Sequence, residues 1–114
     1  RMVAVEVARG ASESVVVPVK EAGSKVAWRF ACEAYDVSFT ATFHPAGGGA
    51  VEVQGATRVA TLSGLFDAAE PGDFELVFDN TFSYMRGKSV KYDVMVVAAD
   101  GEDVADANHE PPPA

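Results

Sequence analysis

Cysteine and histidine are scarce in this chain of 114 residues. Cys32 is the only cysteine, so no disulfide can form within the chain, which favours a reducing compartment such as the cytoplasm. The two histidines are His44 and His109. A metal site needs clustered His, Cys or carboxylate ligands, and these three residues are predicted to lie apart, in a strand, a loop and a tail. The sequence therefore predicts no metal site and no cofactor.

Long apolar runs are also missing. No apolar segment approaches the roughly 20 residues that a membrane-spanning helix needs, so no transmembrane segment is expected. The chain starts at Arg1 and leads directly into a strand pattern, which predicts no signal peptide. A start at arginine further predicts that the chain is a piece of a longer protein.

Basic residues are few, and they are unevenly matched by acidic ones. Residues 1–99 carry 12 acidic and 9 basic side chains, whereas residues 100–114 carry five acidic and no basic side chains. The net charge of −8 is therefore mainly a property of the C-terminal end. Because binding to a phosphate backbone needs a broad basic face, no nucleic-acid partner is expected.

The usual catalytic groupings are absent from the sequence. A nucleophilic site needs Ser or Cys beside a base, but His44 is the only histidine before the C-terminal end, and no serine sits on a sharp glycine elbow. The carboxylates fall at predicted strand ends and on wet faces. The sequence therefore predicts that the chain is not an enzyme and has no catalytic residues.

The chain is instead rich in short segments in which apolar and polar residues alternate. This period of two is typical of strands with one buried and one solvated face. Short strands separated by turn signals at intervals of roughly ten residues favour a sandwich. We therefore predict an all-β fold, an antiparallel, two-sheet, jelly-roll-like β-sandwich of about 7–8 strands. The segments with clear alternation are 3–7, 15–19, 26–32, 37–43, 73–79 and 88–98.

Other segments give weaker signals. Residues 50–62 are expected to form one or two strands, and residues 64–72 a loop. Pro18 lacks an N–H group and should place its strand at an edge or a bulge. Residues 1–99 are predicted to form one domain, followed by an acidic, proline-rich, disordered tail or linker over residues 100–114. The expected core residues are Val17, Trp28, Phe30, Phe39, Leu76, Phe78 and Tyr92.

The turn after residue 79 is the most informative local feature. Asp79 and Asn80 should end a strand, because their side chains bond to nearby backbone and tolerate left-handed turns. The following loop combines aromatics, Met and cations, which are enriched at interfaces and also suit an anionic membrane surface. In the alternative interpretation, the aromatics plug the end of the sandwich and the cations are merely solvated. The candidate partner- or lipid-binding residues are Phe82, Tyr84, Met85, Arg86, Lys88 and Lys91.

The order of residues along the chain resembles that of GOLD (Golgi dynamics) domains. The C-terminal half has Gly72-x-Phe-x-Leu-x-Phe-Asp-Asn-Thr-Phe-Ser83, then basic residues and Val90-x-Tyr92. The N-terminal half has Gly23-Ser-x-Val-x-Trp-x-Phe30, followed by Asp36-Val-x-Phe39. The resemblance covers roughly residues 2–98. It is closer to the cytosolic branch of the family. The lumenal cargo receptors usually carry a cysteine pair, a coiled coil and a membrane span, and none of these is expected from this sequence.

The resemblance implies a function in traffic between membranes. It implies a non-enzymatic protein–protein interaction module in vesicle-mediated transport, Golgi dynamics or lipid transport, in a cytoplasmic protein peripheral to Golgi or endosomal membranes. The alternative that it implies is a phospholipid-contacting accessory domain beside a CRAL-TRIO lipid-transfer domain. A small hydrolase or a lectin-like sugar binder remains a third interpretation. The expected partners are thus a protein or an anionic phospholipid.

Overall fold

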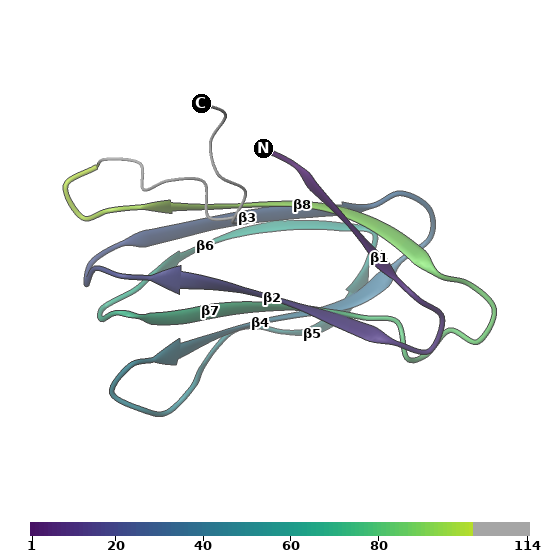
Figure 1. Ribbon diagram of the computed structural model, residues 1–114, viewed down its shortest axis with the longest axis horizontal. Helices are drawn as coiled ribbons and strands as arrows, with labels where there is room; N and C mark the ends of the chain where they lie inside the picture. The colour runs from purple at the N-terminus through teal and green to yellow at the C-terminus, as the bar shows by residue number, and fades with distance from the viewer. Residues whose placement is uncertain (102–114) are drawn as a thin grey trace.

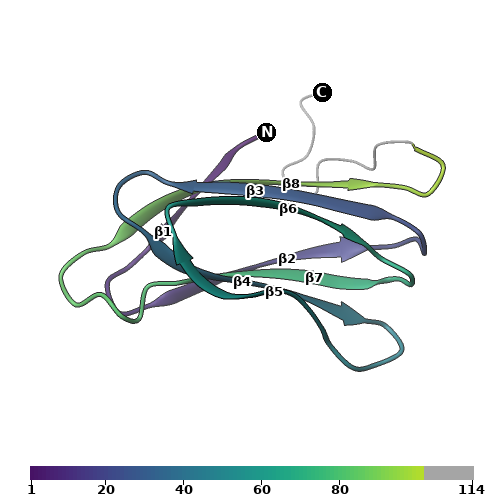
Figure 2. The ribbon, with the colours of Figure 1, turned by 180° about the vertical axis from the view of Figure 1, so that it is seen from behind.

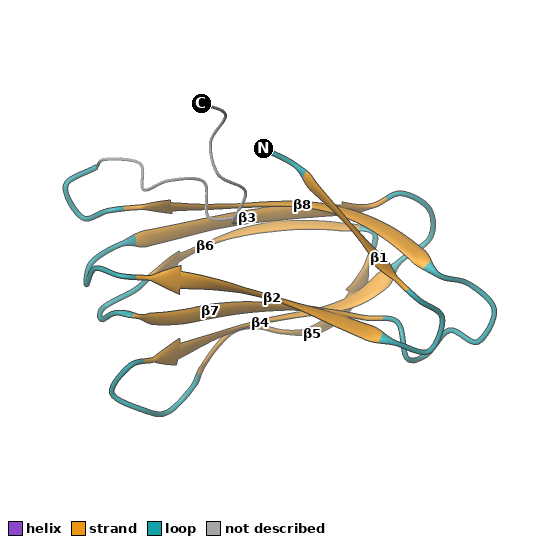
Figure 3. Ribbon diagram, in the orientation of Figure 1, coloured by secondary structure: helices purple, strands orange, loops and turns teal. Residues whose placement is uncertain are grey.

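The computed structural model describes residues 1–101, and within that range it contains eight strands and no helix (Figure 3). The predicted all-β sandwich is confirmed. Most of the predicted tail, from residue 102 onward, lies outside the described residues. The strands are β1 (Val3–Val7), β2 (Ser12–Val19), β3 (Lys25–Cys32), β4 (Val37–Pro45), β5 (Val51–Val59), β6 (Thr61–Asp67), β7 (Gly72–Asp79) and β8 (Lys88–Val97).

The strands form two antiparallel sheets of four, stacked face to face (Figure 1). One sheet has the order β1-β8-β3-β6 and the other has the order β2-β7-β4-β5. Strands far apart in the sequence therefore pair: β1 with β8, β2 with β7 and β3 with β6. This nested pairing of eight strands is the connectivity of a jelly roll.

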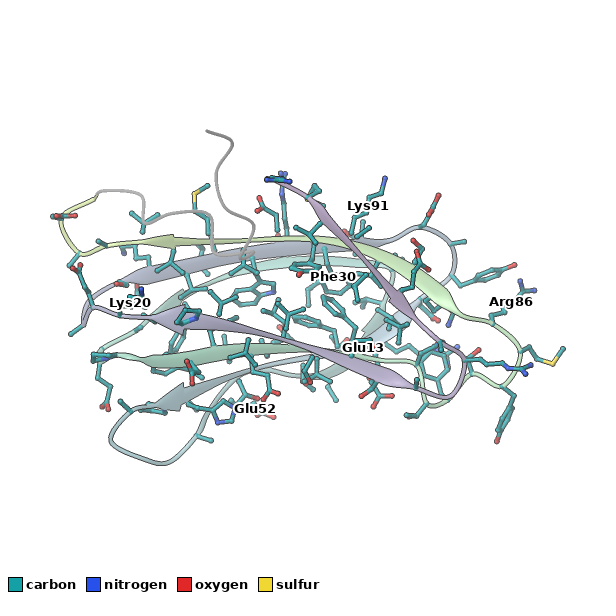
Figure 4. The ribbon with its side chains drawn as sticks, viewed as in Figure 1. Glu13, Lys20, Phe30, Glu52, Arg86 and Lys91 are labelled. Carbon is teal, nitrogen blue, oxygen red and sulfur yellow. The ribbon has the colours of Figure 1, made fainter. Side chains whose placement is uncertain are left out.

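The core lies between the two sheets, where every second side chain of each central strand points inward. The pattern of β4 is strict, because its alternate residues from Val37 to Phe43 are buried. Four aromatic rings meet at the centre: the ring centroids of Phe30 and Phe39 are 4.6 Å apart, and Phe78 contacts both of them as well as Tyr92. Figure 4 shows Phe30 among the side chains that fill the space between the sheets. All seven predicted core residues are buried.

Two of the weaker predictions have different outcomes. Pro18 does lie on an edge strand, because β2 pairs only with β7 in its sheet. The predicted loop over residues 64–72 is wrong in its first half, since Gly64 to Asp67 belong to β6 and pair with β3. Residues 50–62 contain β5 and the start of β6, joined at Ala60, so the chain passes there from one sheet to the other (Figure 2).

Candidate partner-binding surface

The loop between β7 and β8 projects from one end of the sandwich (Figure 1). Its base is fixed by Asn80, which is fully buried. The Asn80 Nδ2 group donates to the carbonyl oxygens of Ala8 at 3.2 Å and Arg86 at 2.8 Å, and the Asn80 N–H donates to the Ala11 carbonyl at 2.8 Å. One side chain thus ties both ends of the loop to the β1–β2 connection.

The residue before Asn80 shapes the turn. Asp79 Oδ1 accepts hydrogen bonds from the Thr81 N–H at 2.8 Å and from the Thr81 hydroxyl at 2.6 Å. These bonds favour the ionised carboxylate. They hold the pKa of Asp79 below its ordinary value, with the larger effect from the Thr81 hydroxyl and the smaller from the Thr81 N–H. The prediction that Asp79 and Asn80 form a structural turn is confirmed.

Lys88 requires a correction to its predicted role as a partner-contacting cation. Only 4% of its surface is exposed. Its ammonium group donates to Asn80 Oδ1 at 2.8 Å and to the Asp36 carbonyl at 2.9 Å, and it lies 4.6 Å from the centroid of the Phe82 ring. A buried charge needs such partners. Lys88 is therefore an internal support for the loop and does not reach a partner.

The tip of the loop is the part that faces outward. Tyr84 and Met85 are each 85% exposed. The next residue, Arg86, lies over an aromatic ring from another turn, with its Cζ atom 4.1 Å from the centroid of Tyr35. The cation–π contact limits the positions that the guanidinium group can take. Two exposed apolar side chains and one oriented cation therefore stand together.

Tyr35 itself has an unusual backbone. Its φ of 69° is the only positive value for a non-glycine residue in the part of the chain that the structure describes. The left-handed region is unfavourable for a bulky side chain, and such residues cluster at functional sites. Tyr35 is nevertheless 58% exposed, so the chain keeps a strained, outward-facing aromatic residue beside the loop tip.

Phe82 is half-buried and has a second cation on its ring. Arg58 Cζ lies 3.8 Å from the Phe82 centroid, and Arg58 Nε is 3.0 Å from Asp36 Oδ2. Arg58 was not predicted from the sequence, because it belongs to β5, 24 positions before Phe82. The register pairs Arg58 with Ser38 of β4, and no local signal in the sequence reveals that neighbourhood.

Lys91 does not join the cluster. It is exposed in the middle of β8, with Ala4 and Ala31 as its neighbours in the register. Figure 4 shows Lys91 on the outer side of its sheet and Arg86 at the end of the molecule. Of the six predicted contact residues, the structure therefore brings Tyr84, Met85 and Arg86 together at the surface.

These side chains surround a shallow depression of about 450 Å³, which we call the loop-end surface. Asp36 is the only carboxylate among the lining residues, against the three cations Arg58, Arg86 and Lys88. A positive, partly aromatic surface thus occurs on a protein of net charge −8. The residues that define its accessible part are Tyr35, Arg58, Phe82, Tyr84, Met85 and Arg86.

The residues considered for metal or nucleophilic chemistry lie elsewhere. Cys32 is buried, its thiol donates to the Ala34 carbonyl at 3.2 Å, and burial raises the pKa of the thiol. His44 Nε2 lies 2.9 Å from Glu75 Oε1 on β7, the neighbouring strand of the same sheet. Within residues 1–101 no three His, Cys, Asp or Glu side chains gather in a way that could hold a metal ion. His109 lies outside the described residues.

A comparison with models of known protein families finds no match for this chain. The resemblance to GOLD domains therefore stays a prediction. In the same described range, the chain forms no helix with the length and apolar character that crossing a membrane requires.

Proposed function

We propose that this chain is a non-enzymatic binding module that contacts an acidic patch on a protein partner through the loop-end surface. The single observation that supports this most is the pairing of exposed apolar side chains with an oriented cation, Tyr84 and Met85 beside Arg86. Aromatics, Met and Arg are enriched at the centres of protein interfaces. The resemblance to GOLD domains supplies the context of this proposal, which is membrane traffic or lipid transport in the cytoplasm.

Rigidity at the base of the loop supports the proposal. Asn80 and Lys88 fix the loop by buried and partly buried hydrogen bonds, and Arg58 is held by Asp36 and Phe82. A surface that is ordered before binding loses less conformational entropy on association. The strained backbone of Tyr35 is consistent with selection for contact, because a glycine would satisfy the same φ at lower energy.

The alternative partner is an anionic phospholipid surface. It is favoured by the position of Tyr84 and Met85 at the tip of the molecule, where apolar side chains could enter the interfacial region beside a cation. Both partners are anionic. The two proposals therefore use the same residues of the loop-end surface and differ only in whether a protein or a lipid surface binds there.

The test is a charge reversal at the loop-end surface, Arg86→Glu, with Lys20→Glu as the matched control. Lys20 is exposed at the opposite end of the sandwich (Figure 4), so both variants change the net charge equally. Wild type and both variants are used in parallel for affinity capture from cell extract and for sedimentation with phosphatidylserine or phosphatidylcholine vesicles. Far-ultraviolet circular dichroism establishes that each variant is folded.

We expect Arg86→Glu to weaken binding about tenfold and to reduce its salt dependence, because exposed charges act through screened attraction. Proteins captured by wild type and by Lys20→Glu but lost with Arg86→Glu would identify the protein partner. Loss of binding to phosphatidylserine vesicles alone would favour the membrane alternative. If neither kind of binding distinguishes the two variants, the loop-end surface is not the contact surface.

A further inference from the structure

The sandwich has four edge strands, and three of them carry features that oppose pairing with another chain. Natural sheets protect their edges with short strands, prolines, charges or bulges. Of the three protected edges, β1 has only five residues and includes Glu6, and β2 contains Pro18. The pairing of β5 with β4 is interrupted by register shifts between Phe39 and Thr42.

The fourth edge, β6, has none of these protections. It pairs with β3 in an unbroken register from Thr61 opposite Ala31 to Asp67 opposite Lys25. Residues 61–66 contain no charged residue and no proline. The charge of Asp67 is matched within its own sheet, since its Oδ1 lies 3.1 Å from Lys25 Nζ. The edge is therefore free of bulges and uncharged over residues 61–66.

The outer side of β6 presents one large apolar side chain, Leu65, beside the polar Ser63. Leu65 is 78% exposed, which is unusual for a large aliphatic residue in the middle of a strand. It borders a shallow depression of about 510 Å³ on the outer face of the sheet, whose walls include the apolar Ala27 and Met95 and the charged Arg29 and Asp93. The unpaired edge, the exposed Leu65 and this depression thus lie side by side.

We propose that β6 is a self-association edge, at which two copies of this chain pair antiparallel about a two-fold axis through Gly64. The result is one continuous eight-stranded sheet, built from two copies of β1-β8-β3-β6. Because each copy uses the one unprotected edge among the strands of residues 1–101, the assembly closes at two copies. This inference is independent of the proposed function, since the loop-end surface involves neither β6 nor its neighbour β3.

The pairing partner is inferred from the self-complementarity of the strand. Centred on Gly64, the register sets Leu62 of one copy opposite Phe66 of the other, and both are partly buried, inward-facing residues. It sets Ser63 opposite Leu65 on the outer face. Each Asp67 meets Thr61 of the second copy, so no like charges oppose each other. A shift by one residue would set inward residues against outward ones.

The association is expected to be weak. A seven-residue strand edge with one flanking depression would bury less surface area than the roughly 1,200–2,000 Å² that stable interfaces bury. The dimer should therefore depend on concentration, and it should be studied by analytical ultracentrifugation up to roughly 1 mM, where weak association is populated.

The first test is Leu65→Lys, with Val51→Lys on the bulged edge β5 as the matched control. Both side chains are exposed, so neither change should disturb folding, which circular dichroism verifies. We expect the wild type and Val51→Lys to dimerise and Leu65→Lys to raise the dissociation constant at least about tenfold, because two lysines would flank the paired edge. A wild type that stays monomeric, or a dimer insensitive to Leu65→Lys, would overturn the proposal.

The second test examines the register. Directly opposite residues in an antiparallel pair are about 4.5–5.5 Å apart at Cα, within disulfide range, whereas diagonal ones are about 7–8 Å apart. Mixing the Ser63→Cys and Leu65→Cys proteins under mild oxidation should give a disulfide-linked dimer. Each variant alone should cross-link poorly. The buried Cys32 is present in every sample, so it does not account for a difference between them. Equal cross-linking of the single variants would exclude the register centred on Gly64.

Discussion

At the scale of single residues, Asn80 shows how one amide can organise a surface without belonging to it. Its Nδ2 group serves carbonyls from both sides of the loop, and its Oδ1 atom accepts from the buried ammonium of Lys88. The exposed tip residues depend on this arrangement, because they make few contacts of their own. The contact residues and the residue that positions them are therefore different.

We predict that Asn80→Ala lowers the free energy of unfolding by about 3 kcal/mol, since buried groups that lose a hydrogen-bond partner retain their desolvation cost. The ammonium of Lys88 would keep only the Asp36 carbonyl as an acceptor. Urea unfolding measures the change. Gln54→Ala is the control, because that amide makes one bond, to the adjacent Gly55 carbonyl, and its loss should cost far less. Similar values for both variants would contradict the prediction.

The sequence predicts the chemical type of the loop residues but not their burial. Tyr84, Met85 and Arg86 have the character expected of a contact surface, and they lie at the surface. Lys88 has the same character, but it lies inside, where its ammonium group donates to the Asp36 carbonyl. Because Asp36 is 52 positions away in the sequence, this burial could not be predicted locally. Arg58 carries no local signal at all. Such long-range partners follow from the order of the strands, which local alternation does not determine.

At the scale of elements, β6 is the strand that the sequence conceals. Gly64 has the character of a loop residue, yet it lies opposite Trp28 in the register. A Cβ atom at Gly64 would come within 2.2 Å of the Trp28 indole. The glycine is therefore needed for a close approach between strand and side chain, and its conformational freedom is not the reason for its presence.

We predict that Gly64→Ala destabilises the protein by roughly 2–3 kcal/mol, because the indole or the strand must shift in a packed core. The control is Gly55→Ala in β5, where the added Cβ would come 3.3 Å from Glu52 Oε1, the end of a flexible side chain. Thermal unfolding of the two variants should differ by several degrees. A harmless Gly64→Ala would show that the Trp28 ring repacks easily.

At the scale of the whole molecule, the alternation of residues predicted the sandwich and its core. The inward faces of β3, β4 and β7 follow directly from residues such as Phe30, Phe39 and Leu76. The membership of each strand in a sheet could not be predicted, because antiparallel pairing through the backbone is nearly the same for any two strands. The nested order arises from packing all eight strands at once.

We predict slow folding, on a timescale of about milliseconds to seconds, because most strand pairs join distant parts of the chain. The single tryptophan is a convenient probe, since Trp28 is buried against Phe74 with the ring centroids 5.5 Å apart. Stopped-flow refolding from urea should show the same rate by Trp28 fluorescence and by circular dichroism. Refolding that is complete within microseconds would contradict the predicted dependence of the folding rate on distant strand pairs.

The pairing of β1 with β8 has a consequence for how the protein is made on the ribosome. Among the described strands β1 is translated first, and its partner in the sheet, β8, is translated last. Since β8 lies between β1 and β3, a product that stops before residue 88 also deprives β3 of one neighbour. Nascent chains and products that end before β8 will therefore present exposed apolar strands to chaperones and proteases until β8 joins the sheet.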